Sequence, residues 1–280
     1  MNKSNSAALY ALISGVIWSF TGLLCKLVSW NSFTLMGARS LVALAVLGIG
    51  RGSFRIRPSK GLWITGAGIS LTSLLYMTAL RLTCAANAIV LQYTSSVFVI
   101  LYMLLVKKQR PLKSEAAAAA FVILGVCLCF AGGLAAGQLT GNLIALLSGV
   151  TFAMVFISTR YSGCDPLDGV YFGTLLSCPF AVFTFFDSAF SPTPVQLLIL
   201  LAMGCGLGLG YLFFSLGMRQ GISAVKACII SNVEPVLNPI WIFVFMGEKP
   251  GALNIVGAAV VLLAITLQSL YENQKSKRAA

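Results

Sequence analysis

Three charged side chains lie within stretches that are otherwise almost entirely hydrophobic, and they are Glu234, Arg39 and Lys226. A charge in an apolar environment is costly unless it is paired or faces water. Burial favours the neutral form of a carboxyl group, so Glu234 could take up and release a proton, or could hold an amine. Arg39 and Lys226 could attract a carboxylate, or could extend along their apolar stems to lipid headgroups. These residues are therefore the first candidates for coupling or for binding a charged substrate.

Polar groups in the segment 222–246 gather on one side if the segment is a single helix. At 100° per residue, a face of about 140° holds most of them, namely Ser223, Lys226, Ser231, Glu234, Asn238 and Trp241. This stripe predicts a cavity wall or, alternatively, polar contacts that join helices. Pro235 favours the cavity, because a proline frees a backbone carbonyl in the middle of the membrane. The alternative for Glu234 is a structural carboxylate, paired with a neighbouring base or with the backbone, that fixes the bend at Pro235.

Other kinds of chemistry are excluded by residue types and spacing. The chain has no histidine, which removes the usual general base and the commonest metal ligand. Its eight cysteines lack metal-binding or redox spacing, and no Walker motif is present for the use of ATP. The run of alternate glycines from Gly204 to Gly210 predicts close helix packing, since no strand precedes it to make a nucleotide loop. We therefore predict no catalytic site, metal or cofactor, and no enzyme.

The elements that hold these residues follow from composition. Of the 280 residues, 58% are hydrophobic and 9% are charged, against roughly 25% charged in soluble domains. This excludes an ordinary soluble protein, a disordered chain and a disulfide-rich module. At roughly 20 residues per membrane-spanning helix, we predict an all-α membrane protein with ten transmembrane helices in the lipid bilayer, at 7–27, 32–50, 61–80, 84–106, 115–134, 141–160, 168–187, 195–217, 222–246 and 251–271.

Basic residues predict the orientation of these helices. With the N-terminus in the cytoplasm, three loop residues lie outside, Lys26, Arg81 and Lys249. Fourteen lie inside: Lys3, Arg51, Arg55, Arg57, Lys60, Lys107, Lys108, Arg110, Lys113, Arg160, Arg219, Lys275, Lys277 and Arg278. This bias follows the positive-inside rule, so both termini are predicted to be cytoplasmic. The net charge of +12 is then a topology signal, and no nucleic-acid partner is predicted.

The two halves of the chain resemble each other. Six residues recur 134 positions later in the same order, since Leu9, Ala11, Leu12, Ser14, Gly15 and Val16 match Leu143, Ala145, Leu146, Ser148, Gly149 and Val150. Further on, Ser96 matches Pro235 at an offset of 139. Repeats at 1–134 and 135–280 with five helices each must have opposite orientations in the membrane. Inverted repeats can exchange conformations around a central site, although a duplicated bundle with no such cycle is an alternative. A monomer would suffice, and a homodimer is compatible with this arrangement.

The repeat extends the list of candidate residues. The face of 84–106 that corresponds to the Glu234 stripe holds Asn87, Gln92, Ser95, Val99 and Tyr102, whereas Tyr93 and Thr94 fall off it and are expected to pack against other helices. Aromatic residues match in pairs as well, Trp18 with Phe152 and Tyr76 with Phe214. They could form the walls of a binding box, or could face lipid or the protein core.

These features resemble the drug/metabolite transporter superfamily, EamA type. The resemblance lies in Val233-Glu234-Pro235-Val236, in the following Gly247-Glu248-Lys249-Pro250, in Leu91 to Phe98 and in Arg39. Members commonly have proline where this chain has Ser96. The resemblance implies a ten-helix secondary transporter, often an exporter of amino acids or other metabolites, with a cavity lined by the first, third, sixth and eighth helices. The helix-1 glutamate of the small multidrug relatives has no counterpart here.

We expect secondary transport of a small metabolite by alternating access. The expected location is the bacterial cytoplasmic membrane. An acid, bases and aromatic groups together would suit an amino acid with an apolar side chain. Alternative substrates are a quaternary amine, a drug, or a nucleoside or sugar derivative, and protons are a candidate coupling ion. A lipid-handling or non-transporting membrane protein is the alternative from another class.

Overall fold

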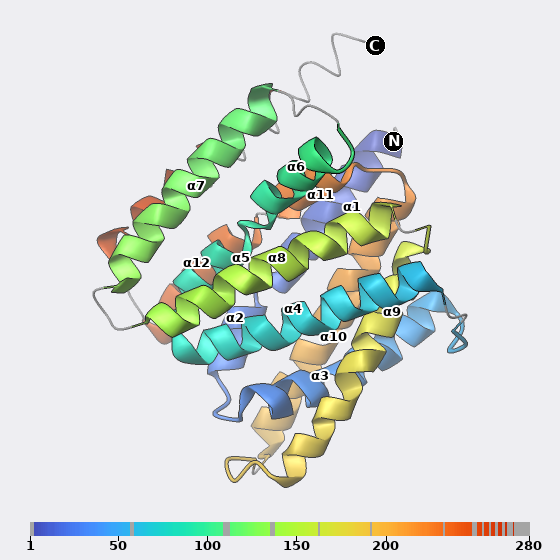
Figure 1. The fold of residues 1–280 in the computed structure, drawn as a ribbon. Coiled ribbons are helices and arrows are strands. Elements are labelled where there is room, and N and C mark those ends of the chain that lie inside the picture. Colours follow the sequence, from blue (N-terminus) through green and yellow to red (C-terminus); the bar gives the residue numbers. More distant parts are fainter. Residues whose placement is uncertain are drawn as a thin grey trace.

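The computed structural model describes the chain apart from residues 1–2, 57–58, 109–112, 135–137, 162, 191, 232, 248–250, 254, 258, 261–262, 265–266, 268–270 and 272–280. Within the described part every regular element is a helix (Figure 1). The elements are α1 (Lys3–Trp18), α2 (Thr21–Lys26), α3 (Ser32–Arg51), α4 (Lys60–Leu82), α5 (Ala85–Gln92), α6 (Ser95–Leu105), α7 (Lys113–Leu134), α8 (Leu139–Tyr161), α9 (Pro166–Ser177), the 3-10 helix η1 (Cys178–Phe185), α10 (Pro194–Arg219), α11 (Ala224–Ser231) and α12 (Glu234–Met246). Most described residues between 252 and 271 are also helical.

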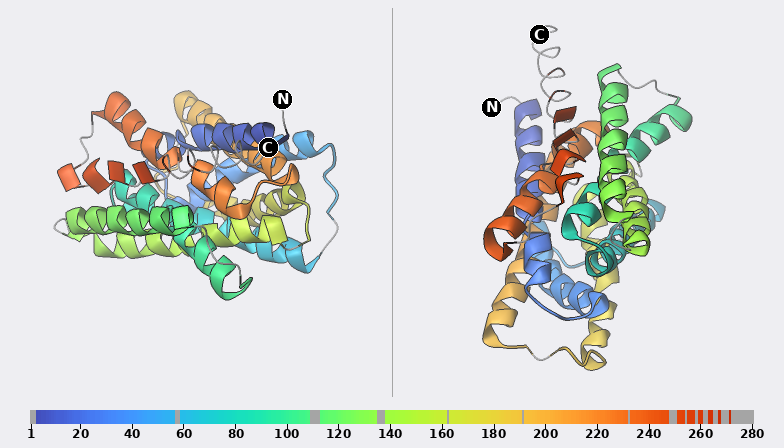
Figure 2. Two further views of the ribbon diagram at one scale, coloured as in Figure 1. Left: turned by 90° about the horizontal axis from the view of Figure 1, so that it is seen from above. Right: turned by 90° about the vertical axis from the view of Figure 1, so that its left-hand side faces the viewer.

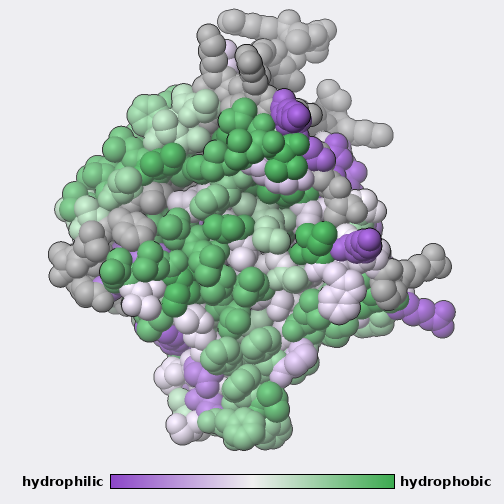
Figure 3. All heavy atoms as spheres, in the orientation of Figure 1, coloured by the Kyte–Doolittle hydropathy of each residue, from purple (hydrophilic) through white to green (hydrophobic). Residues whose placement is uncertain are grey.

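Among the described residues, seven helical stretches are long and apolar enough to cross a membrane. They are Ser6–Lys26, Ser32–Arg51, Lys60–Leu82, Asn87–Leu105, Leu139–Arg160, Pro166–Phe185 and Pro194–Arg219. Many large apolar side chains lie on the surface, among them Ile49, Leu198 and Leu263. The face seen in Figure 3 is largely hydrophobic, as expected of a surface that meets lipid. The all-helical prediction is confirmed for the described chain, whereas ten spans and cytoplasmic termini stay predictions.

Three of the predicted spans are interrupted near their middle. The breaks fall between α1 and α2, between α5 and α6, and between α11 and α12, and they can be followed in the two views of Figure 2. Only the third break has a proline beside it, Pro235. At the second break, the Thr94 hydroxyl donates to the Leu91 carbonyl (2.7 Å) and the Ser96 hydroxyl donates to the Tyr93 carbonyl (3.1 Å). The same two carbonyls also accept from the backbone N–H groups of Thr94 and Ser96, so they are satisfied at this break, where no proline stands.

Two of the breaks are packed in the same way against the opposite half of the chain. A Cβ at Gly15 of α1 would lie 3.2 Å from the Ser231 carbonyl at the α11–α12 break. A Cβ at Gly149 of α8 would lie 2.9 Å from the Gln92 carbonyl at the α5–α6 break. Gly15 and Gly149 occupy matching positions in the sequence repeat. Each half therefore contributes a glycine that lets its helix lie directly on a broken helix of the other half.

The glycine run of α10 produces the close packing predicted for it. A Cβ at Gly204 would lie 2.8 Å from the Arg39 carbonyl of α3, and one at Gly208 would lie 3.0 Å from the Ala43 carbonyl. Without side chains at these positions, α10 lies against the backbone of α3. This contact fixes the helix that carries Arg39.

Two ion pairs join the ends of α3, α9 and α10 on the side predicted to be cytoplasmic. Arg51 Nε bonds to Asp168 Oδ1, and Arg219 donates to both carboxylate oxygens of Asp165 at 2.7 and 2.8 Å. Burial alone would raise the pKa of Asp165, but the Arg219 guanidinium and the N–H groups of the first turn of α9 lower that pKa overall. The N-terminal turn of α9 is thus tied by its two carboxylates to both neighbouring helices.

Candidate binding cavity

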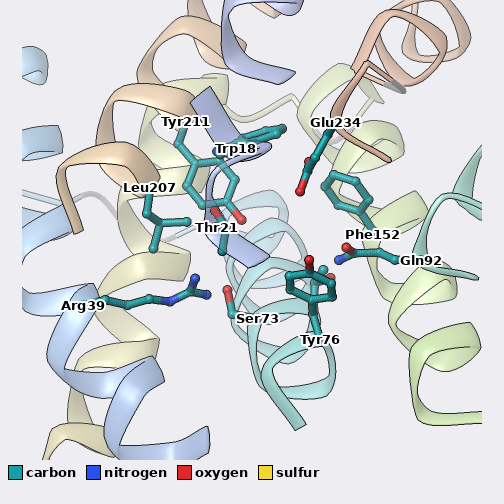
Figure 4. Close-up of a pocket in the computed structure, with 11 residues that line it drawn as sticks. Trp18, Thr21, Arg39, Ser73, Tyr76, Gln92, Phe152, Leu207, Tyr211 and Glu234 are labelled. Carbon is teal, nitrogen blue, oxygen red and sulfur yellow. The ribbon is translucent and has the colours of Figure 1, made fainter. Parts of the chain in front are cut away.

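A cavity of about 50 Å³ lies among the buried parts of the broken helices. Its lining consists of Trp18, Thr21, Arg39, Thr72, Ser73, Tyr76, Gln92, Phe152, Leu207, Tyr211 and Glu234. These residues come from both halves of the chain (Figure 4). The volume suffices for a few water molecules and is well below the roughly 300–1,000 Å³ of sites for drug-sized ligands. The cavity therefore has to widen before it can take an organic substrate.

The Arg39 guanidinium and the Glu234 carboxylate point into this cavity from opposite sides (Figure 4). Both residues are buried, with 2% and 5% of their surface exposed. Both belong to the described chain, and no ion pair within 4 Å joins them there. The cavity thus holds a guanidinium and a carboxyl group that do not pair with each other, so each is open to a group of a ligand.

Arg39 is short of hydrogen-bond acceptors. Its Nε is buried without a partner in the described chain. Reaching a lipid headgroup would require an exposed guanidinium, so the alternative that Arg39 extends to the membrane surface is wrong. The sequence could not decide this, because the position of Arg39 along α3 is compatible with either direction of the side chain.

Glu234 is held by a tyrosine that the sequence assigned to packing. The Tyr93 hydroxyl donates a 2.5 Å hydrogen bond to Glu234 Oε2, and Tyr93 has no exposed surface. The interpretation of Tyr93 as a packing residue alone is therefore wrong. It assumed one continuous helix over 84–106, whereas the break after Gln92 changes the direction of every later side chain.

Aromatic rings form much of the remaining wall. Trp18 and Phe152, matched through the repeat, meet with ring centroids 6.2 Å apart, and Trp18 lies 5.1 Å from Tyr211. The Tyr76 hydroxyl is buried and has no partner in the described chain. Phe214 is not among the lining residues. Its ring packs on that of Trp18, with ring centroids 5.8 Å apart.

Several other predicted site residues lie outside the lining. Asn238 donates to the Ser19 carbonyl (3.0 Å) and Trp241 donates to the Ser19 hydroxyl (2.9 Å), so both hold the α1–α2 break. Four more predicted residues lie outside the lining, namely Ser231, Ser95, Tyr102 and Lys226. Ser231 is buried, and the Ser95 hydroxyl lies 3.4 Å from the Cys228 sulfur. Tyr102 belongs to α6, and Lys226 to the first turn of α11. The stripe on 222–246 is not one cavity wall, because the break before Val233 divides it. Glu248 and Lys249 lie outside the described residues.

Five lining residues were not singled out from the sequence, namely Thr21, Thr72, Ser73, Leu207 and Tyr211. Thr72 and Ser73 stand four and three residues before Tyr76 on α4, which places them on the same side of that helix. Extending the helical spacing from Tyr76 could have found them. Tyr211 follows the glycine run of α10, and the sequence offers no sign that it faces the cavity.

The fold and the cavity define a polytopic helical membrane protein with a buried site of mixed charge. Residues 5–131 and 139–270 each match the model of the EamA-like transporter family, in the drug/metabolite transporter superfamily. The chain therefore belongs to this family of membrane transporters and has its two-repeat architecture. Both the resemblance and the expectation of a transporter rather than an enzyme are thereby supported.

The comparison with solved structures agrees on the fold. One match is titled only "Crystal structure of protein"; it has a TM-score of 0.73 and 20% sequence identity, and the alignment covers 95% of this chain and 98% of that chain. At this identity the match shows the fold alone. No curated protein sequence matches the chain.

Proposed function

We propose that this protein is a secondary active transporter that exports a small amino acid by alternating access around the Arg39–Glu234 cavity. The observation that carries the proposal is the separation of these two buried opposite charges within one cavity. An amino acid would place its carboxylate on Arg39 and its ammonium group on Glu234. Its apolar side chain would then lie against the aromatic wall around Trp18 and Phe152.

The broken helices support alternating access. Interrupted helices at a repeat interface are the usual place for substrates in transporters with inverted repeats. Here the two breaks between α5 and α6 and between α11 and α12 adjoin the cavity through Gln92 and Glu234. Movement at these breaks would widen the small cavity first toward one side and then toward the other. The proposed location is the bacterial cytoplasmic membrane with both termini inside. A reporter fused to the C-terminus and found on the outer side of the membrane would contradict that orientation.

Uptake of a solute mixture by proteoliposomes tests the proposed function. Purified protein is reconstituted into vesicles, and the vesicles are incubated with a mixture of amino acids, amines, nucleosides and sugars. Mass spectrometry then identifies the solutes that have entered. We expect small apolar amino acids. Uptake of quaternary amines alone would replace the substrate class, and uptake of no solute would favour a lipid-handling or non-transporting protein.

Proton coupling is the proposed second role of Glu234. The ionisable groups around this carboxyl group are Tyr93, Arg39, Tyr76 and Tyr211. An imposed pH gradient should change the rate of uptake by the wild type and leave the rate of Glu234→Gln unchanged. An equal response of the two proteins would remove proton coupling through Glu234 while leaving the substrate assignment intact.

A further inference from the structure

The hydrogen bond between Tyr93 and Glu234 joins the broken helices of the two repeats at their interruptions. Tyr93 is the residue that follows α5, and Glu234 is the first residue of α12. The two residues are 141 positions apart in sequence, and both are buried. A contact between two interruptions differs from a contact between rigid helix faces, because a small movement of either half-helix directly changes the distance between the two hydrogen-bonded side chains.

The backbone at both ends of this contact is also packed against the opposite half of the chain. Gly149 of α8 packs on the carbonyls just before Tyr93, whose own carbonyl accepts from Ser96 within the first break. Gly15 of α1 packs correspondingly against Ser231 and Val233 at the second break. The Tyr93–Glu234 bond thus joins two equivalent breaks directly, beside the contact of Ser95 in α6 with Cys228 in α11.

The side chain of Glu234 has one hydrogen bond in the described chain, and Tyr93 donates it. Arg39, Tyr76 and Tyr211 face the same carboxyl group from α3, α4 and α10 without bonding to it. A hydrogen bond to a carboxylate is roughly twice as strong as one to a neutral acceptor. Neutralisation of Glu234 by a proton, or partial neutralisation by a bound ammonium group, therefore weakens its bond to Tyr93.

We propose that Tyr93 is a positioning residue for Glu234 and that their hydrogen bond transmits the charge state of Glu234 to the helix breaks of both repeats. This inference rests on the proposed function, because it assigns to the transport cavity the means by which loading loosens the surrounding helices. With Glu234 ionised and free of ligand, the bond holds the two breaks together. With Glu234 neutralised, the half-helices separate more readily and the cavity can widen.

Amide hydrogen exchange of the purified protein in lipid nanodiscs tests this proposal without any substrate. The peptides that cover 91–96 and 231–237 report the two breaks. Tyr93→Phe removes the hydroxyl and keeps a ring to pack against Phe152, which lies 5.6 Å away. We expect exchange at both breaks to become roughly tenfold faster or more. Tyr171→Phe is the matched control, because it changes another buried tyrosine that lies outside the cavity lining, and it should leave exchange at the breaks unchanged.

Variants of the carboxyl group separate a transmitting contact from a merely structural one. Glu234→Gln keeps a neutral acceptor, so its exchange should be intermediate at both breaks, whereas Glu234→Met should match Tyr93→Phe. The double variant Tyr93→Phe/Glu234→Met should show no further increase, because both changes remove the same bond.

Three results would overturn the proposal. They are a change at one break only, additive effects in the double variant, and wild-type exchange in Glu234→Gln. Should Tyr93→Phe fail to fold, the exchange rates of the wild type, Glu234→Gln and Glu234→Met still test the proposal, because they should increase in that order. Failure of the proposed function is distinguishable, because it would appear as the absence of amino acid uptake with the exchange pattern intact.

Discussion

Arg39 allows a prediction in which stability and function move in different directions. Its side chain is buried, and within the described chain its Nε lacks a partner and no carboxylate forms an ion pair with it. An uncompensated buried charge opposes folding. Arg39→Gln should therefore leave the Tm of the substrate-free protein unchanged or raise it, although it removes a charge from the centre of the molecule.

The same substitution should impair ligand binding. A hydrogen bond between charged groups contributes about 1.5–3 kcal/mol, which corresponds to a roughly 10- to 150-fold change in affinity. Arg39→Gln should weaken binding of L-leucine by about that factor. Arg39→Lys should recover only part of the loss, because a lysine cannot make the two parallel bonds of a guanidinium.

Thermal unfolding with and without L-leucine measures both effects in one assay. Arg51→Gln is the matched control, since Arg51 does bond to Asp168 and lies 5.1 Å from the centre of the Tyr171 ring. The control should lower the Tm of the substrate-free protein by several degrees and retain the shift that L-leucine produces. A lowered Tm in Arg39→Gln together with an undiminished leucine shift would refute the reasoning.

Three further predictions concern the packing that surrounds the cavity. Gly204→Ala should lower the Tm, because its Cβ would overlap α3, whereas Gly206→Ala should not, because its nearest neighbour is an ordinary contact at 3.8 Å. Asn238→Ala should speed amide exchange across the α1–α2 break by roughly five- to tenfold or more, because it leaves a buried carbonyl without its donor. Asp165→Asn should lower the Tm at neutral pH. Since the pKa of Asp165 is lowered in the folded protein, its contribution is present above the unfolded value near 3.9 and is lost as the pH falls through the folded value. The Tm difference from the wild type should therefore begin to shrink below about pH 4 and vanish once the pH is below the folded value.

The helical segments could be predicted from the sequence because each is set by a local property. Long apolar runs separated by charges and prolines give helix limits that agree with the structure within a few residues, as for 195–217 and α10 (Pro194–Arg219). The glycine run of that helix was likewise interpreted correctly. Local hydropathy and small residues suffice for such features, since neither depends on distant parts of the chain.

The cavity was only partly predictable, because the direction of a side chain depends on helix breaks. The repeat found the pair Trp18 and Phe152, which do meet. The polar stripe along 222–246 assigned Asn238 to the cavity, although that residue binds the backbone of the first half. The break at Tyr93 carries no proline to mark it in the sequence, so a continuous helical phase misplaced that residue.

The central claim is that one cavity recognises both charged ends of a substrate, through Arg39 and Glu234. Competition against L-leucine uptake in proteoliposomes tests it most directly, with 4-methylpentanoate and 3-methylbutylamine as analogues that lack the amine and the carboxylate. We predict that leucine competes at least about tenfold better than either analogue, and that this advantage over 4-methylpentanoate disappears in Glu234→Gln and over 3-methylbutylamine in Arg39→Gln. Equal competition by one of the singly charged analogues in the wild type would contradict the account.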